Sequence, residues 1–169
     1  MRYIGVLVAT LTASSCAVVS HDVTNDEVAA SISGKCFVLK QAAYIINIGG
    51  IGPRDQLLIP TGRCRAPDGT IAVDRSCRFE VKSHIPVGST LVVTSVTDKA
   101  YGESGRCWDV RARFEDTQLY SGIFKIPTCI FESYSGGWLQ QGPPELIYGT
   151  GTKLTFRPEK LETCGSRAP

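Results

Sequence analysis

The sequence predicts a mostly β protein, in the form of a small disulfide-linked β-barrel or sandwich. Short runs rich in β-branched and aromatic residues recur along the chain, and clusters of Gly, Pro, Asp and Ser separate them. The 17 glycines and 9 prolines among 169 residues interrupt the chain too often for long helices. No amphipathic pattern of three helical turns is found in the sequence.

The first element is a signal peptide, which we assign to residues 1–15. Arg2 precedes a largely apolar run that begins at Tyr3 and continues to Leu11, and small residues follow this run. This layout is typical of a secretory signal. The run is too short to cross a bilayer, because a membrane-spanning helix needs about 20 apolar residues. We therefore expect the chain to be exported from the cytoplasm.

The residues Ala13, Ser14, Ser15 and Cys16 resemble the lipobox of bacterial lipoproteins. In that family, a cysteine after small residues is lipidated on sulfur and becomes the new N-terminus. Ala13 departs from the pattern, since the family usually has Leu there, and an ordinary signal peptidase site is the alternative. The resemblance implies a lipid such as palmitate on Cys16. It also implies transfer to the outer membrane, because Ala17 rather than Asp follows the cysteine.

The number of cysteines favours lipidation of Cys16. The chain contains 7 cysteines, and an unpaired thiol is a liability in an oxidising compartment. Without Cys16 an even number remains, and these cysteines can all pair as disulfides. They are Cys36, Cys64, Cys77, Cys107, Cys129 and Cys164.

Residues 16–34 predict a lipidated N-terminus followed by a flexible tether, because they are small and polar and show no sustained period. A short helix around Asp26 to Ala30 is the alternative. Residues 35–169 predict a single β domain of ordinary size. Its expected strands are 36–40, 44–48, 56–60, 70–74, 77–82, 90–96, 107–114, 120–126, 145–148 and 153–156.

One hairpin can be predicted in more detail. Strand side chains alternate between two faces, so the even-numbered residues of 108–114, which are all apolar, share one face. The even-numbered residues of 120–126 form the matching set. A loop between the two strands that pairs Phe114 with Tyr120 places both sets on the same side.

Register and spacing favour one pairing of the cysteines. Two of them are diagonal neighbours in the predicted hairpin, and two others flank a Pro-Asp-Gly turn. The remaining two would join the ends of the domain, while other connectivities stay open. In this order, the preferred bonds are Cys107 to Cys129, Cys64 to Cys77 and Cys36 to Cys164.

Residues 85–127 resemble a bacterial SH3-like barrel in the order of their features. A Pro-Gly turn precedes a hydrophobic strand, and a strand with Trp108 and a return strand with Gly122 follow. The resemblance includes no diagnostic motif, and it implies a small barrel.

The sequence contains no recognisable catalytic set. Gly105 to Trp108 resembles the cysteine environment of papain-like proteases, but those enzymes need a downstream histidine, and none follows His84. Thiolates and imidazoles do not occur at the spacing of a zinc site. We therefore expect no enzyme activity, no cofactor and no metal. A pair of carboxylates brought together by the fold, as in a wall-active enzyme, is the alternative.

Three aromatic residues are the candidates for binding a partner. Tyr134, Trp138 and Tyr148 lie in a stretch rich in Gly and Pro, and aromatic side chains on loops often contact partners. The alternative for each is that it covers the core. The net charge of +2, with both signs interspersed, gives no basic surface for nucleic acid.

Together these features predict a lipoprotein anchored by its lipid to the outer membrane, on the periplasmic face. Its expected role is that of a non-enzymatic binding module for peptidoglycan or an envelope protein. The alternative is an inhibitor or immunity lipoprotein that blocks a wall-degrading or toxic enzyme. Many such proteins are small, lipidated, disulfide-bonded β proteins, so this resemblance concerns type rather than motif.

Overall fold

The structure is a computed structural model of the chain, and it describes residues 19–47, 55–60, 79–100, 106–128, 137–141 and 153–165. These residues form strands, turns and irregular segments but no helix, so none of them belongs to a helix that could cross a membrane. The mostly β fold predicted from the sequence is confirmed. The strands are β1 (Val19–Asp22), β2 (Cys36–Leu39), β3 (Ala43–Asn47), β4 (Asp55–Leu58), β5 (Glu80–Ile85), β6 (Thr90–Ala100), β7 (Arg106–Phe114), β8 (Phe124–Ile126) and β9 (Leu161–Thr163).

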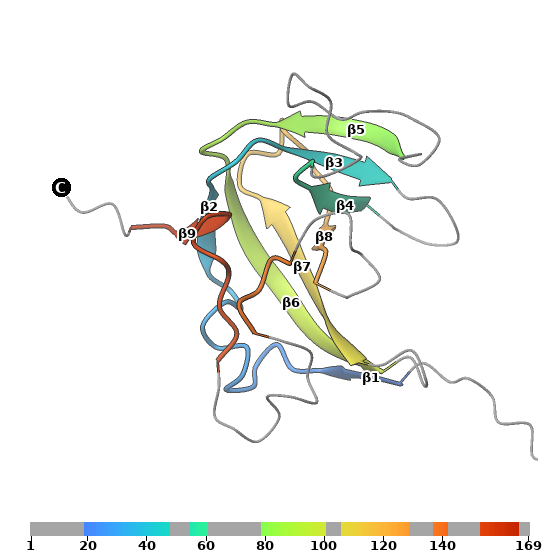
Figure 1. Cartoon of the computed structure of the whole chain (residues 1–169), viewed down its shortest axis with the longest axis vertical. Helices are drawn as coiled ribbons and strands as arrows, with labels where there is room; N and C mark the ends of the chain where they lie inside the picture. The colour runs from blue at the N-terminus through green and yellow to red at the C-terminus, as the bar shows by residue number, and fades with distance from the viewer. Residues whose placement is uncertain are drawn as a thin grey trace, which may run out of the picture.

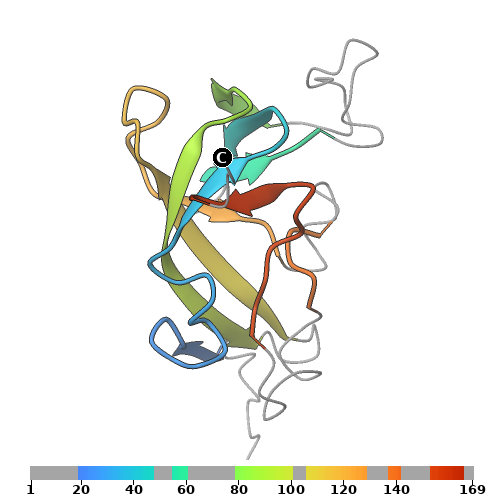
Figure 2. The same ribbon diagram turned by 90° about the vertical axis from the view of Figure 1, so that its left-hand side faces the viewer.

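All of these strands belong to one sheet. Their order is β5-β3-β4-β8-β7-β6-β2-β9, and β1 pairs with β6 beside this row. The sheet curls, so that β3, β4 and β5 lie across one end of β6 and β7 (Figures 1 and 2). The end strands β5 and β9 are not paired with each other, so the described part of the sheet is open rather than a closed barrel.

The long strand β6 is paired along both edges. On one edge β7 runs antiparallel to it from Leu91 to Ala100, with an irregularity between Val93 and Ser95. On the other edge β2 lies beside the start of β6 and β1 beside its end. The first and second strands of the chain thus extend the same edge of β6, although a non-strand segment separates them.

Residues 19–34 are part of the domain, which corrects the prediction of a flexible tether. Val23, Ala29 and Ile32 are buried in the core, with 0%, 0% and 1% of their surface exposed. The expectation was wrong because these apolar residues have neither a helical nor a strand period, and the segment folds as successive turns. The alternative helix around Asp26 to Ala30 is not formed either.

The hairpin of β7 and β8 forms with its apolar residues on one buried face, as predicted. Its register differs, because Val110 pairs with Ile126, two positions away from the register that pairs Phe114 with Tyr120. A shift of two residues leaves the faces unchanged. Tyr120 lies outside the paired strand, and its hydroxyl donates to the carboxylate of Asp55. Burial and this hydrogen bond raise the pKa of Tyr120 to about 12.

Some strands differ from the prediction. The predicted strands 70–74 and 145–148 lie outside the described residues. The predicted strand 153–156 contributes only an isolated bridge between Phe156 and Leu139. Strands β1 and β9 were not expected, because both are short and each contains charged residues.

We expect Ile32→Ala to lower the free energy of unfolding by about 2–5 kcal/mol, because the variant leaves a cavity in the core. Val19→Ala is the matched control, since the side chain of Val19 is 64% exposed and a change there should cost under about 0.5 kcal/mol. Urea denaturation of the soluble domain measures both. Equal stability of the two variants would show that the turn segment is not part of the core.

Candidate functional site

The structure places Trp138 in the core, which corrects its prediction as a binding residue. Its side chain is 0% exposed. The backbone of Trp138 accepts a hydrogen bond from Arg157 N at 2.9 Å, and this contact holds residue 138 against the C-terminal segment. The other two candidate aromatics, Tyr134 and Tyr148, lie outside the described residues.

Lys160 is a buried lysine beside Trp138. Its Nζ donates a hydrogen bond to the carbonyl oxygen of Gly137 at 2.6 Å and lies 5.2 Å from the centroid of the Trp138 ring. Burial lowers the pKa of Lys160 to about 8, and the nearby charge of Arg157 acts in the same direction, while Glu159 opposes it. Because the ammonium holds two distant parts of the chain together, we assign it a structural role.

The two buried acids among the described residues do not form a carboxylate pair. Asp98 pairs in the sheet with Trp108, whereas Asp109 pairs with Thr97, so the two acids point to opposite faces. Asp109 forms an ion pair with Lys99, and Arg111 Nε lies 3.4 Å from its other oxygen. This arrangement neutralises a buried charge, and the other buried acid among the described residues lies on the opposite face.

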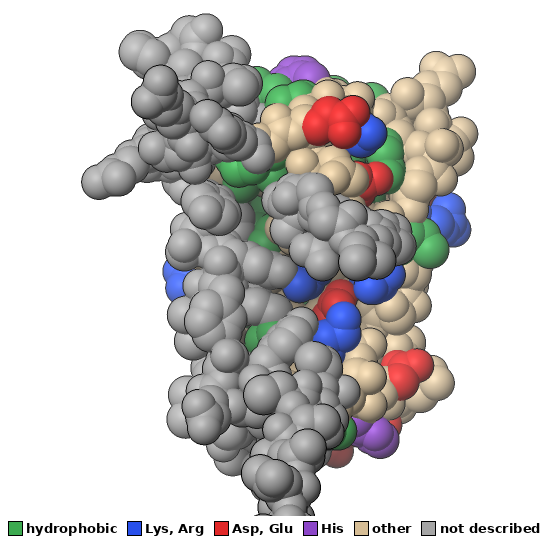
Figure 3. Space-filling view, turned by 90° about the vertical axis from the view of Figure 1, so that its right-hand side faces the viewer, with side chains coloured by type: hydrophobic (Ala, Val, Ile, Leu, Met, Phe, Trp, Pro, Cys, Tyr) green, Lys and Arg blue, Asp and Glu red, His purple; other side chains and the backbone are tan. Residues whose placement is uncertain are grey.

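On the face shown in Figure 3, several described Lys and Arg side chains lie around one acidic side chain near the middle, and other acidic side chains lie above and below them. Among the described residues, no group of His, Cys, Asp and Glu side chains is arranged to hold a metal ion.

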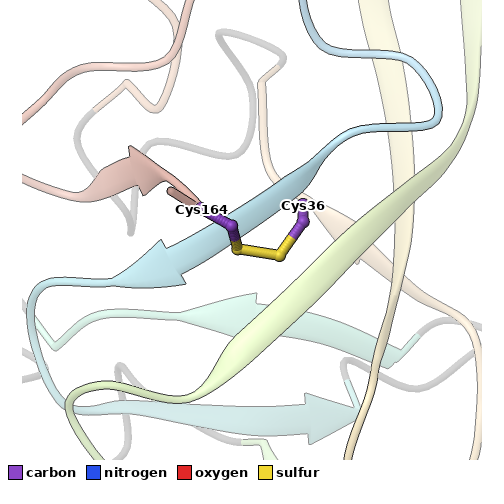
Figure 4. Close-up of a disulfide and its surroundings, with 2 residues drawn as sticks. All are labelled: Cys36 and Cys164. Carbon is purple, nitrogen blue, oxygen red and sulfur yellow. A yellow bond between two sulfur atoms is a disulfide. The ribbon is translucent and has the colours of Figure 1, made fainter. Parts of the chain in front are cut away.

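A disulfide links β2 to the residue that follows β9. Cys36 at the start of β2 is bonded to Cys164, which directly follows β9, and their Cα atoms are 5.4 Å apart (Figure 4). This is the pairing preferred from the sequence. A bond that closes so long a loop typically contributes about 2–5 kcal/mol. Cys107 is disulfide-bonded as well.

The remaining cysteine predictions are not tested by the geometry. Cys16, Cys64, Cys77 and Cys129 lie outside the described residues. The lipidation of Cys16 and the bonds that involve the other three therefore stay predictions.

A groove of about 530 Å³ lies beside the disulfide and is the candidate functional site. It covers the outer face of β2 and β9, near the end of β6 that begins with Thr90. The half-buried Val38 and the disulfide itself supply apolar surface on this face. Val87 in the turn before β6 adds more, and its side chain is 61% exposed.

Two of the charged groups of the groove are paired with each other. Lys40 Nζ lies 2.6 Å from a carboxylate oxygen of Glu162, and both side chains are partly exposed. Glu115 adds an exposed carboxylate at the rim. Apolar surface with a few polar groups around it is typical of a site that binds a ligand.

Sequence reasoning did not identify this groove. Its lining comes from three segments that are far apart in the chain, namely 36–40, 87–90 and 162–165, together with Glu115. Each of these segments is ordinary in composition. Only the predicted bond between the ends of the domain hinted that the first and last segments meet.

Comparisons with protein-family models, with curated proteins and with solved structures found no match to this chain.

The lowered pKa of Lys160 predicts a dependence of stability on pH. Above about pH 8 the folded protein loses this proton, while the unfolded chain keeps it up to the ordinary pKa of 10.5. The free energy of unfolding should therefore rise with pH in this window. We expect the stability of the wild type relative to Lys160→Met to increase by about 2 kcal/mol between pH 7 and pH 9.5.

Urea denaturation at both pH values measures this difference, with the exposed Lys153→Met as the matched control. A difference between wild type and Lys160→Met that stays constant, or that changes equally in the control, would contradict the assignment.

Proposed function

We propose that the protein is a bacterial lipoprotein that acts as a non-enzymatic binding module on the periplasmic face of the outer membrane. The signal-like N-terminus and the lipobox-like Cys16 support export and lipidation. The groove beside Cys36 and Cys164 is the observation that carries the binding role, because it combines exposed apolar surface with a rigid, cross-linked frame.

The chemistry of the groove favours binding over catalysis. Its lining includes no histidine, and both of its cysteines are in the disulfide and so cannot act as nucleophiles. Its Lys40 is already paired with Glu162. The described lining therefore lacks the free thiol and imidazole of a cysteine hydrolase, and its carboxylates are those of Glu115 and of Glu162, which is held by Lys40.

The ligand that suits this groove is a peptide segment with both apolar and charged side chains. Val87 and Val38 can contact apolar side chains of the peptide. Glu115, Lys40 and Glu162 can form ion pairs with its charged side chains. Such a segment could come from an envelope protein or from the peptide part of peptidoglycan. The experiment below distinguishes these two sources.

We expect Val87→Asp to weaken binding to the partner at least roughly tenfold, because it places a charge in the apolar part of the groove. Ile123→Asp is the matched control, since Ile123 is 54% exposed and does not line the groove. Sedimentation with purified peptidoglycan measures binding to the cell wall. Capture of proteins from envelope extract, followed by titration of the purified partner, measures binding to an envelope protein.

Loss of binding in both variants, or in neither, would contradict a role for the groove. Inhibition of a wall-degrading or toxic enzyme by the soluble domain would support the inhibitor alternative instead.

A further inference from the structure

The first strand begins very close to the proposed lipid. Only Ala17 and Val18 lie between Cys16 and Val19, where β1 starts. A residue spans at most about 3.6 Å along an extended chain, so the Cα atoms of Cys16 and Val19 can be no more than about 11 Å apart. A lipid on Cys16 would therefore bring β1 to the membrane surface.

β1 is firmly attached to the rest of the domain. It pairs with β6 from Val19, opposite Ala100, to Asp22, opposite Thr97. The attachment continues past the strand, because Val23 N donates to Val96 O at 3.0 Å. Detaching this segment would also expose core side chains such as Ile32. The domain thus has no described flexible region between β1 and the core.

The groove lies at the other end of β6. The groove is lined by Thr90, the first residue of β6, whereas β1 starts opposite the last residue, Ala100. A strand rises about 3.4 Å per residue, so these two ends are roughly 30 Å apart. Figure 1 shows β1 and the pair β2–β9 near opposite ends of β6.

The chemistry of the β1 end is compatible with a bilayer surface. The first three residues of β1 include no acid, and Val19 exposes 64% of its surface. The first acid, Asp22, accepts hydrogen bonds from the amide and hydroxyl of Thr24. These contacts lower the pKa of Asp22 and direct its carboxylate back onto its own chain.

We infer that a lipid on Cys16 holds the β1 end of the sheet against the bilayer surface and leaves the groove facing away from it. This inference rests on the lipidation in the proposed function. The segment that the groove binds then lies roughly 30 Å from the membrane surface.

Energy transfer from tryptophan to a dansyl-labelled lipid headgroup tests the orientation. We compare the transfer in two variants of the full lipidated protein, Ser20→Trp and Val87→Trp, in phosphatidylethanolamine and phosphatidylglycerol vesicles. Both positions are exposed, and they lie near opposite ends of β6. The unchanged protein gives the background from Trp108 and Trp138. We expect at least a threefold larger increase in transfer from Ser20→Trp than from Val87→Trp.

Two further variants make the result specific. His21→Trp, also exposed, is a second reporter at the β1 end and should behave like Ser20→Trp. A Gly/Ser insertion of about 20 residues between Ala17 and Val18 should remove the difference between the ends, because it supplies the flexible tether that the chain lacks.

Labelling with palmitate separates this inference from the proposed function. Absence of label from the wild type, or equal labelling of Cys16→Ser, would overturn the lipidation and with it the orientation. Equal transfer from the two ends in a wild-type protein that carries the label would overturn the orientation alone.

Discussion

β6 pairs along both of its edges, and this double pairing determines where the other parts of the domain lie. On one edge β7 presents alternate apolar side chains to the core. On the other edge β2 pairs with the start of β6 and β1 with its end. The turns between these two strands place side chains such as Ile32 in the same core. Pairing along both edges gives the backbone N–H and C=O groups of β6 hydrogen-bond partners. Buried backbone groups need such partners, so this pairing allows β6 to lie in the interior of the sheet.

The elements with a strong period were predictable from the sequence, and those without one were not. The alternation of apolar and charged residues in β7 correctly gave its buried face. The side chains of Val23 and Ile32 are equally buried, but they lie outside the strands, where burial follows no period. Trp138 was misplaced for a related reason: a Gly-rich sequence around an aromatic residue fits an exposed loop as well as a segment packed on the core.

The groove depends on contacts between the ends of the domain, which a single sequence specifies only weakly. Counting cysteines and assigning the other pairs suggested the bond between Cys36 and Cys164, and the structure contains this bond. The neighbouring surface, with Val87 and the pair of Lys40 and Glu162, follows only when the strands are placed in register. With the groove near one end of β6 and β1 near the other, the fold separates the proposed site of binding from the strand nearest the proposed site of anchoring.

The chain from β1 to β2 is fixed to β6, so that the domain begins within a few residues of Cys16. Amide hydrogen exchange in the full protein tests it most directly. The amides of Val23 and Gly34 donate to the carbonyl oxygens of Val96 and Val93, both at 3.0 Å. We expect these two amides to be protected to the same degree as those of β6. Exchange of both at the rate of an unstructured chain, with β6 still protected, would contradict the claim.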